Sequence, residues 1–232
     1  MIAIKVENLQ FAYETGRPVL DGISFEIEQG SFTGLIGESG CGKSTLCHIL
    51  CGIIPHAIGG ELSGQAKVGG VDLRQTNLKD LSQVIGFVMQ DPDRQIVSST
   101  VEDELAFGPE NLCIAPEEIR KRVQDTLELL GLGNMRLSDP NKLSGGQKQL
   151  VAIGSILTLQ PEIILLDEPY SHLDQVGREH VSRIIKVLRE QGKTIIAVEH
   201  DHSLIEDADR WILLEQGKIK KEGIPREVGE YI

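Results

Sequence analysis

Hydrophobic positions follow two patterns along this 232-residue chain, and together they predict alternating strands and helices. Short apolar runs predict buried parallel strands, since such strands are covered on both faces. These runs span 32–37, 84–89, 163–167 and 194–199. Helical spacing is found at Leu46, Ile49, Leu50 and Ile53, and further helices are predicted over about 116–130, after Ser144 and over about 175–190. This alternation predicts an α/β domain whose helices cover a largely parallel sheet.

Both ends of the chain carry a different pattern. "IAIKVENLQFAY" and "GISFEIEQG" alternate apolar and polar residues, as half-exposed antiparallel strands do. "RWILLEQGKIKKEG" predicts a hairpin around Gln216 and Gly217. We therefore predict one domain over 1–232, with a mostly antiparallel β-subdomain at 1–35, an inserted helical subdomain at about 95–145, and a core formed by the remainder.

Composition and charge narrow the functional classes. The net charge of −12 argues against a nucleic-acid partner. No apolar run approaches the roughly 18–20 residues of a membrane span, and the N-terminus has no signal-peptide pattern, so we expect an intracellular protein. The cysteines have no zinc spacing, and Cys47 and Cys51 are predicted to be buried thiols on one helix face.

A glycine-rich loop follows the first buried strand and opens a helix. "GESGCGKST" fits G-x-x-x-x-G-K-[ST], in which glycines let the backbone wrap phosphates. Lys43 would reach the β- and γ-phosphates of ATP, and Ser44 would supply a hydroxyl ligand to Mg²⁺. The residues expected to bind the nucleotide here are Gly37, Ser39, Gly40, Cys41, Gly42, Lys43, Ser44 and Thr45.

Three other strand ends carry polar residues that suit phosphoryl transfer. "IILLDEP" delivers Asp167 to a strand end, where it would hold Mg²⁺, and the adjacent Glu168 would activate the attacking water. His200 follows the strand 194–199 and is predicted to contact the γ-phosphate, although a lone His at a strand end is more often structural. Gln90 ends the strand 84–89 and would reach Mg²⁺ or the attacking water.

A second phosphate-binding pattern, "LSGGQ", occurs a hundred residues after the first. Ser144, Gly145, Gly146 and Gln147 open a predicted helix, where bare N–H groups meet the positive end of the helix dipole. Hydrolysis requires an enclosed γ-phosphate, yet Glu168 and His200 would face open solvent. We therefore predict a head-to-tail dimer in which each "LSGGQ" closes over the ATP of the other subunit.

The set resembles the ATP-binding cassette (ABC) ATPases: P-loop, Gln90, "LSGGQ", "LLDEP" and His200 occur in the family's order over essentially the whole chain. The resemblance implies a P-loop NTPase fold and ATP hydrolysis coupled to transmembrane transport. It also implies that Tyr13 stacks on adenine and that Asp174 lies in a loop communicating between the two sites. The chain departs from common family residues, without touching a phosphate ligand, at Leu150, Gly154, Tyr170, His172 and Gln175.

Within the family, the stretch "QDPDRQIVSSTVEDELAFGPENL" (90–112) is similar to the energy-coupling factor (ECF) type, importers of vitamins and of cobalt or nickel ions. There it forms a helix that grips a membrane partner. We expect Ser99 or Thr100 to cap this helix, with Glu102 or Asp103 completing a capping box. An integral membrane coupling subunit would dock a basic amphipathic helix at 99–112. Apolar surface is expected from Val101, Leu105 and Phe107, and negative charge from Asp91, Asp93, Glu102, Asp103 and Glu104. The alternative is a solvated acidic helix.

The sequence therefore predicts the ATP-binding and ATP-hydrolysing subunit of an ECF-type importer. It would lie peripherally at the cytoplasmic face of the cell membrane, paired with an identical or a different ABC ATPase subunit. The alternatives are the ATPase of another ABC transporter class, an ABC ATPase acting on DNA or ribosomes, and a soluble P-loop kinase. The chain has neither a long coiled-coil insertion nor a second cassette, and "LSGGQ" has no role in a kinase.

Overall fold

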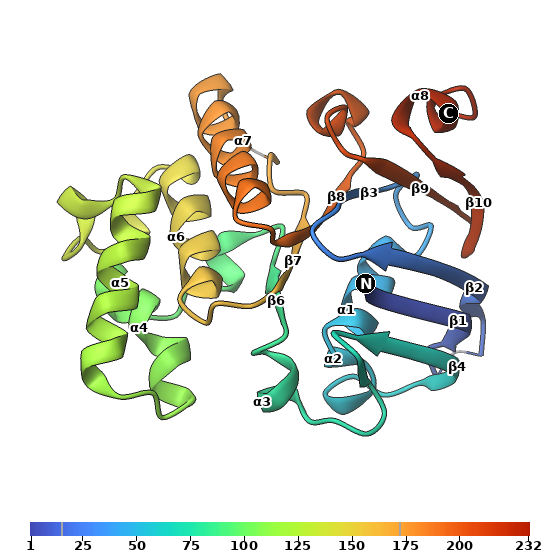
Figure 1. Cartoon of the computed structure of the whole chain (residues 1–232), viewed down its shortest axis with the longest axis horizontal. Coiled ribbons are helices and arrows are strands. Elements are labelled where there is room, and N and C mark those ends of the chain that lie inside the picture. The colour runs from blue at the N-terminus through green and yellow to red at the C-terminus, as the bar shows by residue number, and fades with distance from the viewer. Residues whose placement is uncertain (15, 172) are drawn as a thin grey trace.

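The computed structural model describes residues 1–14, 16–171 and 173–232, so His172 lies outside the described residues. Their strands form two sheets (Figure 1). The six-stranded sheet has the order β10-β9-β3-β8-β7-β6, with all neighbours parallel except β10 and β9. Its strands are β3 (Phe32–Ile36), β6 (Ile85–Val88), β7 (Ile163–Asp167), β8 (Thr194–Glu199), β9 (Arg210–Glu215) and β10 (Lys218–Gly223). The predicted α/β class and the four predicted buried strands are confirmed.

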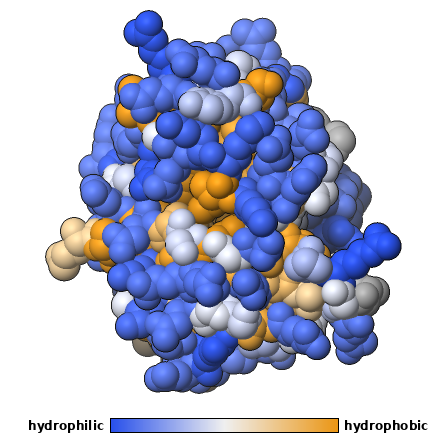
Figure 2. Space-filling model, turned by 90° about the vertical axis from the view of Figure 1, so that its right-hand side faces the viewer, coloured by the Kyte–Doolittle hydropathy of each residue, from blue (hydrophilic) through white to orange (hydrophobic). Residues whose placement is uncertain are grey.

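The second sheet is antiparallel and extends beyond the boundary expected at 1–35. Its order is β2-β1-β4-β5, formed by β1 (Ile2–Ala12), β2 (Pro18–Glu28), β4 (Glu61–Val68) and β5 (Val71–Asp72). The boundary at 35 is also too late, because residues 32–36 form β3 of the parallel sheet, as their apolar run predicted. Figure 2 shows the face on the side of β2 and β10, which is largely hydrophilic with a small hydrophobic area near its middle.

The predicted hairpin near the end of the chain is confirmed. Strands β9 and β10 pair antiparallel, and the turn between them is formed by Gln216 and Gly217. Both turn residues have left-handed backbone conformations, with φ of 49° and 76°. Two consecutive positive φ angles are typical of two-residue hairpin turns, because this geometry matches the twist of the paired strands.

Helices cover both faces of the parallel sheet. The long ones are α1 (Lys43–Leu50), α4 (Val101–Asn111), α5 (Pro116–Leu130), α6 (Gly145–Leu157) and α7 (Gln175–Glu190). The short ones are α2 (Ile53–His56), α3 (Leu78–Leu81), α8 (Pro225–Gly229), and the 3₁₀ turns η1 (Pro92–Arg94), η2 (Gly133–Met135), η3 (Pro140–Lys142) and η4 (His202–Ile205). Ile53 was expected to continue the helix of Leu46, but Gly52, with φ of 73°, separates α1 from α2. No helix in the described part of the chain is long and apolar enough to span a bilayer.

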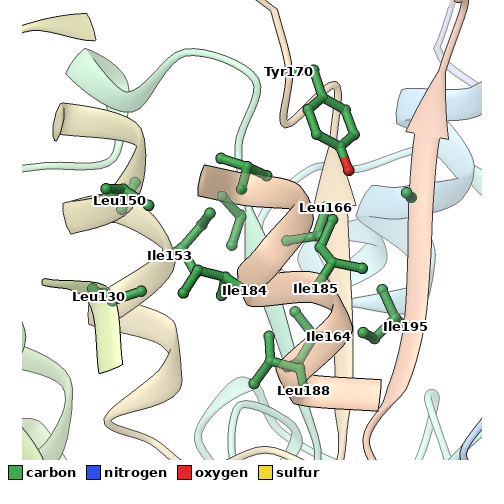
Figure 3. Close-up of a cluster of buried hydrophobic side chains, with 14 of the residues drawn as sticks. Leu130, Leu150, Ile153, Ile164, Leu166, Tyr170, Ile184, Ile185, Leu188 and Ile195 are labelled. Carbon is green, nitrogen blue, oxygen red and sulfur yellow. The ribbon is translucent and has the colours of Figure 1, made fainter. Parts of the chain in front are cut away.

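Two buried clusters lie on opposite faces of the parallel sheet. One fills the space between the sheet, α1 and the antiparallel sheet, and it includes Cys47. Burial raises the pKa of the Cys47 thiol well above its usual value. Cys51 was expected to be buried but is only partly so. The other cluster joins the sheet to α5, α6 and α7. Figure 3 shows α7 in its centre, with Ile184, Ile185 and Leu188 facing residues of α6, β7 and β8.

The helical group α4, α5 and α6 lies to one side of the sheet (Figure 1). Its helix α4 begins as predicted, since the Thr100 hydroxyl accepts a hydrogen bond from the N–H of Asp103. The expectation that Val101 and Leu105 form a partner surface is wrong, because both are fully buried in the core shared with α5 and α6. Gly154 of α6 permits this packing, because a Cβ there would lie 2.6 Å from Leu105 Cδ2.

Two of the acidic residues of α4 hold the chain's own fold together. Glu104 is 2% exposed, and its carboxylate accepts hydrogen bonds of 2.9 Å from the N–H groups of Val97 and Ser98. Glu102 forms a two-pronged ion pair with Arg136, which holds the Glu102 pKa below its usual value. The expected row of five carboxylates facing a partner is therefore not present: these two are occupied within the chain.

We predict that Leu105→Ala lowers the free energy of unfolding by about 2–5 kcal/mol, because it leaves a cavity in a fully buried site. Phe107, two residues further along α4, is 49% exposed, so Phe107→Ala should change that free energy by about 0.5 kcal/mol or less. Urea denaturation of both variants measures this. Equal, small effects would contradict the burial of Leu105.

The strand β8 ends in a buried carboxyl group, that of Glu199, which is 1% exposed. Its Oε1 lies 3.4 Å from the N–H of Tyr170. Burial, with a smaller contribution from Glu168, raises the Glu199 pKa from 4.5 to about 7. The folded chain therefore keeps a proton that the unfolded chain releases, so this group makes the protein less stable as the pH rises from 4.5 to 7.

We predict that Glu199→Gln removes this loss of stability. The variant's free energy of unfolding minus that of the parent should be near zero at about pH 4 and should reach about 3 kcal/mol at about pH 8. Urea denaturation across this pH range measures the difference. A difference that does not vary with pH would contradict the assignment.

Candidate functional site

At two positions of the loop between β3 and α1, only glycine fits the backbone conformation and the space available. Gly37 has φ of 148°, and a Cβ there would lie 2.1 Å from the carbonyl oxygen of Leu214. Gly42 has φ of 110°, and its Cβ would lie 2.8 Å from Leu20 Cδ2. Gly42 also provides no side-chain cap for α1. The first N–H groups of α1 are therefore open to a phosphate, which the helix dipole favours.

Lys43 lies folded across this loop. Its Nζ donates hydrogen bonds of 2.6 Å and 2.9 Å to the carbonyl oxygens of Gly37 and Glu38, and the residue is 7% exposed. The ammonium group is thereby held over the loop that would wrap the phosphates. This arrangement suits the predicted role of Lys43 in neutralising phosphate charge.

A cavity of about 410 Å³ gathers residues that the sequence placed at separate strand ends. Gln90 follows β6, Glu168 follows β7 and His200 follows β8. All three reach this cavity because the carboxyl ends of parallel strands meet at one edge of the sheet. The lining consists of Val19, Ser39, Gly40, Gly42, Lys43, Ser44, Thr45, Gln90, Glu168 and His200. Gly37 and Cys41 line a neighbouring cavity together with His200.

Glu168 is held between the residues that follow the two flanking strands. Gln90 Nε2 donates a hydrogen bond of 2.7 Å to Glu168 Oε2, and His200 Nδ1 lies 3.6 Å from the same oxygen. Glu168 has φ of 45°, a left-handed conformation that is strained for a residue with a side chain. Such strain persists where the surroundings impose it, as at catalytic positions. The carboxylate is thus positioned at the cavity edge, as a general base for water would be.

Asp167 carries a buried carboxyl beside this cavity. Burial, followed by the repulsion of Glu168, raises its pKa to about 6, while Lys43 and a hydrogen bond with Ser44 act in the opposite direction. A divalent cation would stabilise the charged form, and the oxygens of Asp167 and Ser44 are hard ligands that suit Mg²⁺. Across the described residues, no three His, Cys, Asp or Glu side chains are grouped to hold a metal.

The "LSGGQ" residues lie apart from the nucleotide cavity of their own chain. Ser144 caps α6 in a capping box: its N–H donates to Gln147 Oε1 at 2.9 Å, and its Oγ accepts from the Gln147 N–H at 3.3 Å. Ser144 and Gly145 are exposed, and Gly146 is partly exposed. None of these residues lines the cavity at the P-loop. The structure therefore does not bring the two phosphate-binding patterns together within one chain.

Two other predicted residues lie at the margins of the site. The Tyr13 hydroxyl is 3.2 Å from Thr45 Oγ1 in α1, and its ring packs edge-on against Phe11. Its predicted stacking on adenine stays a prediction. Asp174 is exposed and caps α7 by accepting a hydrogen bond of 2.8 Å from the N–H of Gly177. Its predicted role between two sites also stays a prediction.

Sequence patterns did not single out three polar residues that the structure places around the site. Glu199 lies between Val198 and His200, and its only signal was a carboxyl group at the end of an apolar run. Gln95 and Lys148 connect the loop after Gln90 to α6. Gln95 stands inside the stretch 90–112, but its spacing alone does not show that it contacts α6.

Comparisons with known proteins agree with this site. The ABC transporter family profile matches residues 20–171. An ABC transporter ATP-binding protein of Pyrococcus horikoshii is 44% identical over all of this chain and 83% of its own length. An energy-coupling factor transporter ATP-binding protein of Caldanaerobacter subterraneus is 43% identical over 97% of this chain and 82% of its own. The chain spans only 36% of a 45% identical Methanosarcina acetivorans relative.

Solved structures give the same result. The structure of cbiO1 from Clostridium perfringens, part of the ABC transporter complex cbiONQ, has a TM-score of 0.88 at 32% identity, covering 99% of this chain and 91% of that one. The ATP-binding cassette MJ0796, a dimer in a post-hydrolysis state with ADP and Pi, has a TM-score of 0.83 at 28% identity, covering 96% and 99%. The P-loop, Glu168 and the "LSGGQ" helix thus occur on a matching fold, and the chain belongs to the ABC transporter family as one of its ATPase domains.

Proposed function

We propose that this chain hydrolyses ATP as the nucleotide-binding part of an ECF-type importer and works as a dimer with two composite sites. The observation that carries the hydrolytic role is the position of Glu168 at the P-loop cavity, hydrogen-bonded to Gln90 and close to His200. The ECF type is supported by relatives of that name at 41–43% identity. It is also supported by the likeness to cbiO1, which belongs to a larger transporter complex.

In this mechanism the position of each residue in the site sets its role. Lys43 and the N–H groups at the start of α1 hold the phosphates, and Asp167 with Ser44 would hold Mg²⁺, which neutralises developing phosphate charge. Glu168 Oε2 orients a water for in-line attack and accepts its proton. Gln90 and His200, both directed at that oxygen, keep the carboxylate in place and contact the γ-phosphate region.

The dimer supplies the missing wall of each site. In "LSGGQ", Ser144 and Gly145 are exposed, and the whole motif lies outside the cavity of its own chain, so a partner's nucleotide is the ligand we assign to it. The dimeric state of the similar cassette MJ0796 with ADP and Pi supports this arrangement. Closing the dimer would exclude water and surround the γ-phosphate with fixed donors.

Two variants test whether the sites are shared. We predict that Ser144→Arg abolishes hydrolysis while the isolated chain still binds ATP, because Ser144 serves the other subunit. Lys43→Ala should lose ATP binding itself. Mixing the two variants rebuilds one complete site per mixed dimer, so hydrolysis should reappear in the mixture. ATP binding and phosphate release measured on each variant and on the mixture decide the matter.

Loss of ATP binding by Ser144→Arg to the same degree as by Lys43→Ala would mean that each site forms within one chain. Unchanged hydrolysis in Lys43→Ala would contradict the proposed ATPase site as a whole. The two failures are distinguishable, because the first affects only the dimer and the second affects the reaction.

The membrane partner is proposed to dock on the exposed face of α4. Val101, Leu105 and Glu104 are buried, and the exposed residues of α4 include Asp103, Phe107 and Glu110, at positions i, i+4 and i+7. This face combines one aromatic side chain with two carboxylates. It suits a basic amphipathic helix, whose apolar side would cover Phe107 while its cations meet the carboxylates.

We predict that Glu110→Lys combined with Phe107→Ala weakens binding of an arginine-bearing amphipathic helical peptide by at least about tenfold, which corresponds to about 1.4 kcal/mol. Fluorescence anisotropy of the labelled peptide measures this. Glu128→Lys on α5 makes the same charge change at another exposed position and serves as the control. If both variants bind the peptide equally well, α4 is not the docking face.

A further inference from the structure

The side chain of Gln95 connects the loop that carries Gln90 to α6. The backbone N–H of Met89 donates a hydrogen bond of 2.9 Å to Gln95 Oε1. Gln95 Nε2 donates to the carbonyl oxygen of Ala152 at 2.8 Å and to Ser155 Oγ at 3.1 Å. The carboxamide thus uses its acceptor on the end of β6 and both donors on α6.

A second contact joins the same two segments. Lys148 Nζ lies 2.6 Å from Asp93 Oδ1, and the lysine side chain is only 17% exposed. Lys148, Ala152 and Ser155 are at positions i, i+4 and i+7, so they share one face of α6. The loop over 89–95 therefore lies along that face of α6. The ion pair holds the loop near the start of α6, and Gln95 holds it further along the helix.

The two ends of this connection are parts of the two phosphate sites. Met89 directly precedes Gln90, whose Nε2 donates to Glu168 at 2.7 Å. On the other side, α6 begins at Gly145 with Ser144 as its cap, eight residues before Ala152. A helix is stiff over this length, about 12 Å at 1.5 Å per residue. A displacement of "LSGGQ" along α6 is therefore carried to the backbone beside Gln90.

We propose that Gln95 is a positioning residue that couples the Gln90–Glu168 contact in one nucleotide site to the "LSGGQ" helix serving the other site. This inference rests on the proposed shared dimer sites. Gln95 does not line the P-loop cavity; it acts through the Met89 backbone. When "LSGGQ" binds a partner's nucleotide, Gln90 is then aligned with Glu168 at the same time.

The test is a double-mutant cycle on the whole chain. Gln95→Met keeps the side chain's length but removes all three hydrogen bonds. We predict that it lowers kcat by at least about tenfold while KM for ATP stays within about twofold. Gln90→Ala should lower kcat as well, and the double variant should be no slower than Gln90→Ala alone. Gln124→Met, which alters an exposed amide on α5, is the matched control and should leave kcat unchanged.

Additive losses in the double variant would overturn the proposal, because Gln95 would then act independently of Gln90. Wild-type kcat in Gln95→Met would overturn it too. In both cases Lys43→Ala and Glu168→Gln should still abolish hydrolysis, which separates this failure from a failure of the proposed function. Urea denaturation of Gln95→Met shows whether the variant is folded.

The ion pair gives an independent readout that does not remove Gln95. Asp93→Lys or Lys148→Asp alone should lower kcat by about two- to threefold, since a partly exposed pair contributes modestly. The reversed pair, Asp93→Lys with Lys148→Asp, should recover most of the loss. A reversed pair slower than either single variant would contradict a role for this contact.

Discussion

The site depends on the contact of Glu168 with Gln90 and His200 at one edge of the parallel sheet. β6, β7 and β8 end together there, so residues that lie 78 and 32 positions apart from Glu168 meet at one carboxylate oxygen. Glu168 has a left-handed backbone conformation at this edge, and at Gly37 of the P-loop a Cβ would lie 2.1 Å from the carbonyl oxygen of Leu214. A slip of one residue in any of these strands would turn its terminal side chain to the opposite face of the sheet.

The helical group is tied to this edge through its buried face. α7 packs between the sheet and α6 through Ile184, Ile185 and Leu188 (Figure 3). Gln95 and Lys148 then connect α6 to the loop after Gln90. Apolar packing holds the helix group against the sheet, and directional polar contacts set its position relative to the Glu168 carboxylate. The acidic residues of α4 contribute to the same framework, since Glu104 and Glu102 bind groups of their own chain.

Much of the fold and of the site was predictable from the sequence, because their signals are local. The buried strands are continuous apolar runs, and the P-loop, "LSGGQ" and "LLDEP" are short motifs whose flanks identify the adjoining strand or helix. The boundary of the antiparallel sheet was not predictable in this way. β4 pairs with β1 between residues 49 to 64 positions apart, and its alternation, "ELSGQAKV", is too weak to reveal a partner so far along the chain.

The sequence by itself identified the residues whose chemistry suits phosphate and Mg²⁺ and the strand ends that carry them, since residue type and strand order suffice for that. Only the tertiary structure decided which face of α4 is covered: Val101 and Leu105 are buried against α5 and α6, while Phe107 is exposed. An amphipathic pattern shows that one face is apolar but not what covers it. The contacts of Gln95 with Ala152 and Ser155 of α6 likewise join residues 57 and 60 positions apart, and such contacts follow from packing rather than from local sequence.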